Sequence, residues 1–146
     1  MGRRPGGESQ GPRPRVIVVD TSVWIDVFRG NESPTVSRCV ELIEDGAPIA
    51  LTDVILTEIL QGIQSDREAR RVERHMLAFP ILRLESLEDF SLAAQLYRHA
   101  REAGVTIGKT IDCLIAAPCV RAGASLLHAD ADFDRLATCT PLKIFR

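Results

Sequence analysis

The sequence predicts an α/β fold, a three-layer sandwich in which a central parallel sheet has helices on both faces. The run Val16–Val19 is apolar without alternation and ends at Asp20, which is typical of a strand buried on both faces. The stretch Ala124–Ala129 also runs into a carboxylate, Asp130. Segments with helical periodicity separate these and other short apolar runs. Strands that alternate with helices form right-handed β-α-β units and hence a parallel sheet.

The expected helices begin at residues that favour helix N-termini, with Ser, Thr or Asp as caps and Pro34 at a first helical position. The expected strands are 16–19, 47–51, 81–84, 124–130 and 142–145. The expected helices are 23–28, 34–45 with Ser33 as cap, 54–63 with Thr52 and Asp53 as cap, 66 to about 78 with Ser65 and Glu68 as a capping box, 87–104 with Ser86 and Asp89 at its start, and 111 to about 121 with Thr110 as cap, besides a short turn or helix at 132–134.

One folded domain is expected over residues 16–146. Of the 146 residues, 45% are hydrophobic and 26% charged, and the net charge of −2 gives no overall attraction to nucleic acid. Residues 1–15 are basic and rich in Gly and Pro, without apolar periodicity, so we expect them to be disordered. They form either a basic arm that touches RNA or an extension of the start that is not native, and we favour the second interpretation.

The cysteines indicate a reducing compartment. Cys39, Cys113, Cys119 and Cys139 form no C-x-x-C pair, and no Cys/His group has the spacing of zinc ligands. We therefore expect reduced cysteines in a cytoplasmic protein. No apolar run has the length of a membrane span or the character of a signal peptide, so we expect no contact with a membrane.

Four acidic residues stand in unusual places. Asp20 and Asp130 each end an apolar strand, and Asp112 lies in a helix that is apolar almost all round, where an ionised carboxylate is costly unless it is paired or binds a cation. Glu58 lies at the edge of the apolar arc of its helix. Because strand ends and helix starts share one edge of a parallel sheet, we expect the four carboxylates to meet there.

Each of these acids also has a simpler interpretation. Asp20 and Asp130 could cap the turns that follow them, and Asp112 could interact with the positive end of its helix. Glu58 could be a solvated helix residue. Taken together, however, converging carboxylates indicate a divalent cation, Mg²⁺ or Mn²⁺, because these ions prefer oxygen ligands. The chemistry implied is hydrolysis of a phosphate ester by a metal-activated water.

At these residues the chain resembles the PIN-domain ribonucleases, and within them the toxins of bacterial VapBC toxin–antitoxin pairs. The resemblance extends over about residues 16 to 146, and four segments carry it in order: Val18–Asp26, Leu56–Gly62, Asp112–Ala117 and Leu126–Phe133. One departure from the family's pattern is Pro118, which falls inside the expected helix that contains Asp112. We expect it to kink this helix and disturb its later packing.

The resemblance implies a PIN-domain-like sandwich and a Mg²⁺-dependent endoribonuclease that acts on RNA, with tRNA as one candidate. It implies a homodimer that a VapB-type antitoxin silences. Asp20, Glu58, Asp112 and Asp130 would be the catalytic, metal-binding acids. Asp132 would be an accessory acid, and Ser22 a hydroxyl close to the metal.

Contacts with RNA phosphates need basic residues. One candidate set lies at helical spacing and includes Arg67 and Arg71, but interleaved Glu68 and Glu73 favour an ordinary solvated face. The other candidates are Arg98, Arg101 and Lys109. Trp24 and Phe28 are expected to be core residues or, if exposed, anchors for an antitoxin or a second copy.

Two other classes of function compete. A PIN-like module could bind RNA or protein without cutting, although the complete set of four acids argues against this. An aspartate-dependent phosphatase also begins with a strand that ends in Asp, but it needs an acid two residues later, where this chain has Ser22. A response-regulator receiver is a weaker third, because the 81–84 strand offers no Asp.

Overall fold

The computed structural model describes residues 15–146. The prediction for the basic arm therefore lies outside the described residues, except for Arg15. Within the described range, no helix is both long and apolar enough to cross a membrane. The four cysteines are free, and Cys39, Cys113 and Cys119 are buried.

The sheet has five strands in the order β3-β2-β1-β4-β5, and every neighbouring pair is parallel. β1 is central, with Ile17 opposite both Ile49 of β2 and Ser125 of β4. All residues of β1 and β2 are buried, which confirms the prediction from the unbroken apolar run. The strand bounds are β1 Ile17–Val19, β2 Ile49–Thr52, β3 Ile81–Leu82, β4 Ser125–Leu127 and β5 Lys143–Ile144.

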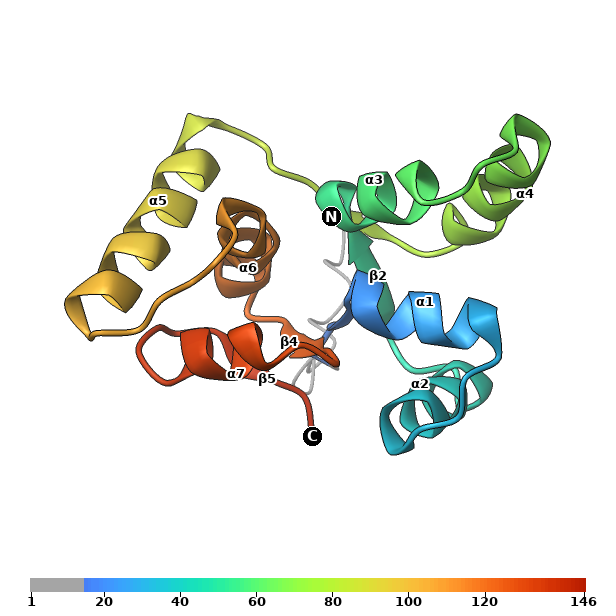
Figure 1. Cartoon of the computed structure of the whole chain (residues 1–146), viewed down its shortest axis with the longest axis horizontal. Coiled ribbons are helices and arrows are strands. Elements are labelled where there is room, and N and C mark those ends of the chain that lie inside the picture. The colour runs from blue at the N-terminus through green and yellow to red at the C-terminus, as the bar shows by residue number, and fades with distance from the viewer. Residues whose placement is uncertain (1–14) are drawn as a thin grey trace, which may run out of the picture.

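Helices cover both faces of this sheet. The chain passes through two crossovers from β1 to β3, then returns across the sheet to β4 and β5. Because each crossover is right-handed, the reversal moves the later helices to the opposite face. Figure 1 shows α1 to α4 on one side of the strands and α5 to α7 on the other. The bounds are α1 Thr21–Arg29, α2 Pro34–Glu44, α3 Asp53–Gln61, α4 Asp66–Met76, α5 Leu87–Glu102, α6 Thr110–Ala122 and α7 Ala131–Ala137.

Most of the predicted caps are present. The hydroxyls of Ser33, Thr52 and Ser65 each accept a hydrogen bond from a backbone N–H in the first turn of their helix. Ser86 is the N-cap residue of α5 as predicted, although its hydroxyl makes no capping bond. The Asp89 carboxylate accepts from the Glu85 N–H at 2.7 Å.

The predicted start of α6 is wrong by one residue. Thr110 is the first helical residue, and Lys109, whose backbone is extended, occupies the cap position without a side-chain bond. α6 continues without a break through Pro118 to Ala122, so the expected disturbance of its later packing is wrong, whereas the expected kink stays a prediction. The Pro118 side chain and Cys119 after it are fully buried, and α6 packs along α5. A single missing N–H is therefore tolerated where neighbouring side chains hold the helix on both sides of it.

Candidate active site

Asp20 lies at the carboxyl end of β1, where the chain turns into α1. Its side chain is 4% exposed. The Ser22 N–H and Ser22 hydroxyl donate to its Oδ2 at 3.0 and 2.6 Å, so Asp20 does cap α1. Its Oδ1, in contrast, is buried without any partner. Burial raises the pKa of Asp20, and the Ser22 bonds offset only part of this rise. Capping therefore accounts for one oxygen and leaves the other free.

Glu58 reaches the same place from α3. The Thr21 hydroxyl donates to Glu58 Oε1 at 2.9 Å, which ties α3 to the start of α1. Burial raises the pKa of Glu58, and the charge of Asp20 raises it further. Glu58, in the second turn of α3, is therefore close to Asp20 and is not an ordinary solvated helix residue.

Asp112 lies in the first turn of α6 and is 5% exposed. Its Oδ2 is buried and has no hydrogen-bond partner. Burial, followed by the charges of Asp130 and Asp20, raises the pKa of Asp112 to about 6, and the Lys109 ammonium opposes this rise. At neutral pH this carboxylate is therefore ionised, although its surroundings disfavour the charge.

Asp130 and Asp132 complete the group at the start of α7. Oδ1 of Asp130 accepts from the Asp132 N–H at 3.0 Å. Carboxylate oxygens of Asp112, Asp130 and Asp132 lie within 4.8 Å of one another. Asp132 also pairs with Arg135, one turn later in the same helix. Asp132 is therefore part of the carboxylate cluster.

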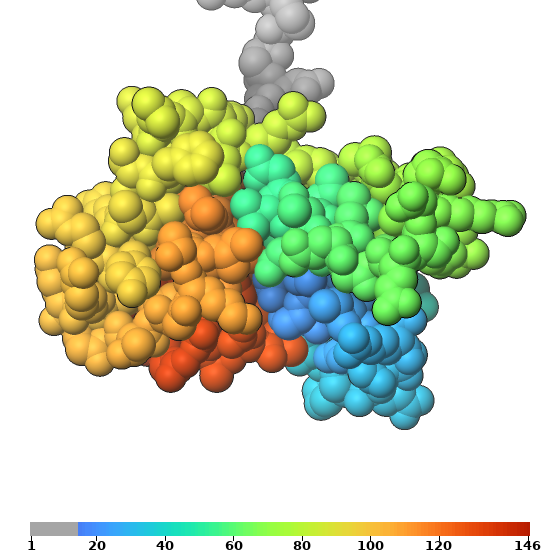
Figure 2. Space-filling model, turned by 45° about the horizontal axis from the view of Figure 1, so that its top comes forward, coloured from blue at the N-terminus to red at the C-terminus, as the bar shows by residue number. Residues whose placement is uncertain are grey.

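The four predicted acids thus come from four elements to one edge of the sheet. Asp112 and Asp130 belong to the close group with Asp132, whereas Asp20 and Glu58 lie outside that group and act on Asp112 through their charges. α3 and α6, which lie on opposite faces of the sheet, contact each other over this edge. Figure 2 shows the surfaces of α3 and α6 side by side, with α1 next to α3. Two buried, unpaired carboxylate oxygens among mutually repelling acids are unfavourable unless a cation neutralises them. The donors are all oxygens, which suits Mg²⁺ or Mn²⁺. The residues present therefore fit a divalent cation.

The predicted basic residues behave differently from the acids. Lys109 directly precedes α6, and its charge acts on both Asp112 and Glu58. Arg67 and Arg71 lie exposed on α4, where Arg71 pairs with Glu68 at 3.4 Å. Arg98 and Arg101 lie exposed on α5. Among residues 15–146 no hydrogen bond or ion pair joins these four arginines to the acids.

Two residues around the acids were missed from the sequence. Thr21 holds Glu58, and His128 accepts a hydrogen bond from the backbone of Asp130. Their only sequence signal is that they lie next to, or two residues before, a strand-end carboxylate. Ser22, which the sequence did single out, binds Asp20 and also accepts from the Ala129 N–H at 3.0 Å.

Comparison with known proteins shows the family of this chain. The model of the PIN domain family matches residues 17–138. A VapC ribonuclease of Mycobacterium bovis is 40% identical over 129 residues, which span 88% of this chain and 96% of the relative. The ribonuclease VapC11 of Mycobacterium tuberculosis matches to the same extent. This chain belongs to the PIN-domain family, among its VapC ribonucleases.

Solved structures agree on the fold of this VapC-family protein. VapBC2 of Rickettsia felis, bound to a DNA fragment of its promoter, superposes with a TM-score of 0.70 at 15% identity, over 89% of this chain and 97% of that one. FitAcB of Neisseria gonorrhoeae gives the same TM-score at 20% identity, over 89% and 96% of the two chains. The predicted sandwich is confirmed, and the matched region contains all of the acids discussed above.

Proposed function

We propose that this VapC-family protein is a Mg²⁺-dependent endoribonuclease and the toxin of a toxin–antitoxin pair. The observation that carries the proposal is the pair of buried, unpaired oxygens, Oδ1 of Asp20 and Oδ2 of Asp112. Asp112 belongs to the cluster with Asp130 and Asp132, and the charge of Asp20 acts on Asp112. A structural network would satisfy these oxygens with protein donors, as the buried Asp89 carboxylate is satisfied by Arg121 and the Glu85 N–H. The chain spends folding free energy to keep them free, which is expected of a ligand site.

Each acid has a role in this proposal. Asp20, Glu58, Asp112 and Asp130 would hold Mg²⁺, or Mn²⁺ in its place, with Asp132 as an accessory acid. Ser22 and Thr21 orient Asp20 and Glu58 by donating to one oxygen of each. When bound, a divalent cation supplies positive charge that polarises a phosphate ester and acidifies water. No Ser or Cys nucleophile is required from the chain.

The substrate side of the proposal is RNA. Lys109 is the predicted basic residue whose charge reaches the acids, so it is best placed to bind a phosphate near the scissile bond. The arginines of α4 and α5 would contact RNA only away from the acidic cluster. VapC20 of Mycobacterium tuberculosis, which shares this fold with a TM-score of 0.61, is described as a toxin that cleaves the Sarcin–Ricin loop. We infer a structured RNA target here, with tRNA among the candidates.

The partner would be a VapB-type antitoxin. Several structures with this fold are VapBC complexes. Trp24 is buried in the core, whereas Phe28 on the same helix is 49% exposed, so only Phe28 remains available to a partner. It lines a groove of about 160 Å³ between α1 and α3, together with Ile25, Ile59 and Glu58. An apolar antitoxin side chain placed there would lie beside a catalytic acid.

We also propose a homodimer. Leu87 and Phe90, at the start of α5, are 83% and 48% exposed, and such apolar surface favours contact with a second copy. Light scattering of the purified toxin measures the mass. A monomer at micromolar concentration would contradict this part of the proposal.

The test of the function is cleavage of total RNA by protein freed of antitoxin, with Mg²⁺ and with EDTA. Wild type should give discrete fragments with Mg²⁺ only, and Asp20→Asn should give none. Asp45→Asn, an exposed residue at the end of α2, is the matched control and should cut like wild type. Absence of cleavage in every lane, with RNA still bound, would favour the non-catalytic module. A trapped aspartyl-phosphate would favour the phosphatase.

A further inference from the structure

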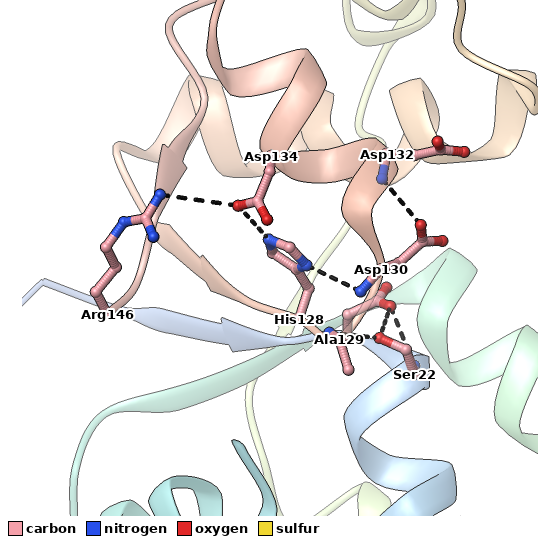
Figure 3. A network of polar contacts seen from close by, with 8 residues as sticks. Ser22, His128, Ala129, Asp130, Asp132, Asp134 and Arg146 are labelled. Atoms are coloured by element: carbon pink, nitrogen blue, oxygen red, sulfur yellow. Dashed lines mark hydrogen bonds and ion pairs between the residues drawn. The ribbon is translucent and has the colours of Figure 1, made fainter. Parts of the chain in front are cut away.

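The turn after β4, residues 128–130, positions Asp130 and is fixed by two side chains. Ser22 Oγ accepts from the Ala129 N–H at 3.0 Å, and His128 Nδ1 accepts from the Asp130 N–H at 3.0 Å. Figure 3 shows the His128 ring between Asp134 and the backbone of Asp130. The His128 bond is made to the amide of the same residue whose carboxylate belongs to the acidic cluster.

The His128 ring is itself held in one orientation. Its side chain is 6% exposed, and its centroid is 5.4 Å from that of Phe133. Because Nδ1 accepts a hydrogen bond, the ring proton of the neutral imidazole must be on Nε2. Nε2 lies 3.2 Å from Oδ1 of Asp134, which accepts a hydrogen bond from Nε2–H. Asp134 is in turn 3.9 Å from the Arg146 guanidinium.

This geometry excludes one role and favours another. Both nitrogens of His128 are engaged, one by an amide and one by Asp134, a residue outside the carboxylate cluster. The ring therefore has no free nitrogen for a substrate or a water. What it does is fix the backbone from which the Asp130 carboxylate extends toward Asp112 and Asp132.

We propose that His128 is a positioning residue of the acidic centre, held by Asp134 in the tautomer that lets Nδ1 fix the Asp130 amide. The inference rests on the proposed function, because it assigns the centre a divalent cation. Without the Nδ1 bond the turn rotates more freely, and the Asp130 carboxylate spends less time near its neighbours. Residues that orient metal-binding side chains in this way typically contribute about 10–100-fold to metal affinity or activity.

The variants Asn and Gln separate positioning from simple packing. Asn places an acceptor oxygen near the position of Nδ1 and can accept from the N–H two residues later, as Asn does in turns. Gln places its amide near Nε2, so it can bind Asp134 but cannot reach the Asp130 amide in the same way. The Asn and Gln side chains both fill part of the volume of the imidazole ring, whereas the Ala side chain of His128→Ala leaves that volume empty.

The experiment titrates Mn²⁺ calorimetrically into antitoxin-free protein and follows unfolding in parallel. His128→Gln and His128→Ala should lose about 10–100-fold in Mn²⁺ affinity, and His128→Asn should recover most of the loss, although His128→Asn and His128→Gln melt at similar temperatures. His99→Gln, an exposed histidine on α5, should bind Mn²⁺ like wild type. In wild type, ¹⁵N shifts of the ring should show a protonated Nε2 and an unprotonated Nδ1.

Equal losses in His128→Asn and His128→Gln would overturn the proposal, as would a proton on Nδ1. The ring shifts need neither metal nor RNA, and the Mn²⁺ titration needs no RNA. A wild-type protein that binds Mn²⁺ with the expected ranking of variants but cuts no RNA therefore contradicts the proposed function alone.

Discussion

Replacing Asp112 by Asn should stabilise the metal-free protein while abolishing cleavage. The carboxylate is buried, and its pKa is raised from 3.8 to about 6. At pH 7.5 it is ionised in both the folded and the unfolded chain, so the folded state carries the whole penalty. About two pKa units correspond to roughly 3 kcal/mol. Loss of a favourable charge at the start of α6 removes about 0.3–1 kcal/mol of this gain.

We therefore expect the free energy of unfolding of Asp112→Asn to exceed that of wild type by about 1–3 kcal/mol. This corresponds to a rise of roughly 3–10 °C in Tm for a chain of this size. Because the pKa is raised on folding, the penalty in wild type appears as the pH increases from about 4 to about 6. The difference between the two proteins should be large at pH 7.5 and small at pH 4.5. Scanning calorimetry in EDTA measures both.

Addition of Mg²⁺ should raise the Tm of wild type more than that of the variant. Asp45→Asn, an exposed substitution outside the cluster at the C-terminal end of α2, should stabilise the protein by less than about 1 kcal/mol, because it removes a negative charge from the negative end of a helix. A variant that is less stable than wild type in EDTA at pH 7.5 would refute the reasoning, because the buried charge would then be satisfied by the protein itself.

Three further predictions concern other parts of the molecule. Asp89 accepts from the Glu85 N–H at 2.7 Å and from Arg121 at 2.8 Å, and these contacts lower the pKa of Asp89. Asp89→Asn should therefore lower the Tm at pH 7 by several degrees, and the difference in Tm from wild type should close below about pH 4, whereas a difference that does not change with pH would contradict this linkage. Phe28→Ser, which removes the apolar ring without adding a charge beside Glu58, should weaken binding of the antitoxin at least tenfold by calorimetry without lowering the cleavage rate of the free toxin. Unchanged binding would remove the α1–α3 groove from the interface. Lys109→Met should raise KM for RNA several-fold more than it lowers kcat in steady-state cleavage, whereas an unchanged KM would mean that Lys109 does not bind the substrate.

The fold and the acids were predictable because each leaves a local signal. A run such as Val16–Val19 has no polar alternation, and only burial on both faces explains it. Asp112 stands out because a carboxylate in an apolar helix conflicts with its surroundings. The parallel topology then brings strand ends and helix starts to one edge without any further information.

The remaining features depend on tertiary contacts that no local pattern encodes. The Thr21–Glu58 bond joins residues 37 apart in the chain, and the tautomer of His128 depends on Asp134 and on the turn geometry. The start of α6 was misplaced by one residue because Thr110 is a good cap in isolation, while the backbone turns at Lys109. The sequence pattern around the basic residues of α4 and α5 does not indicate how far these residues lie from the acids.

The most direct test of the central claim is the rate of RNA cleavage as a function of Mn²⁺ concentration, for antitoxin-free wild type and Asp20→Asn. The proposed site predicts a wild-type rate that is zero in EDTA and saturates with Mn²⁺, and a rate at least a thousandfold lower, on the order of a lost catalytic group, for Asp20→Asn at every concentration. Cleavage that persists in EDTA, or that Asp20→Asn retains, would show that these carboxylates do not form the catalytic centre.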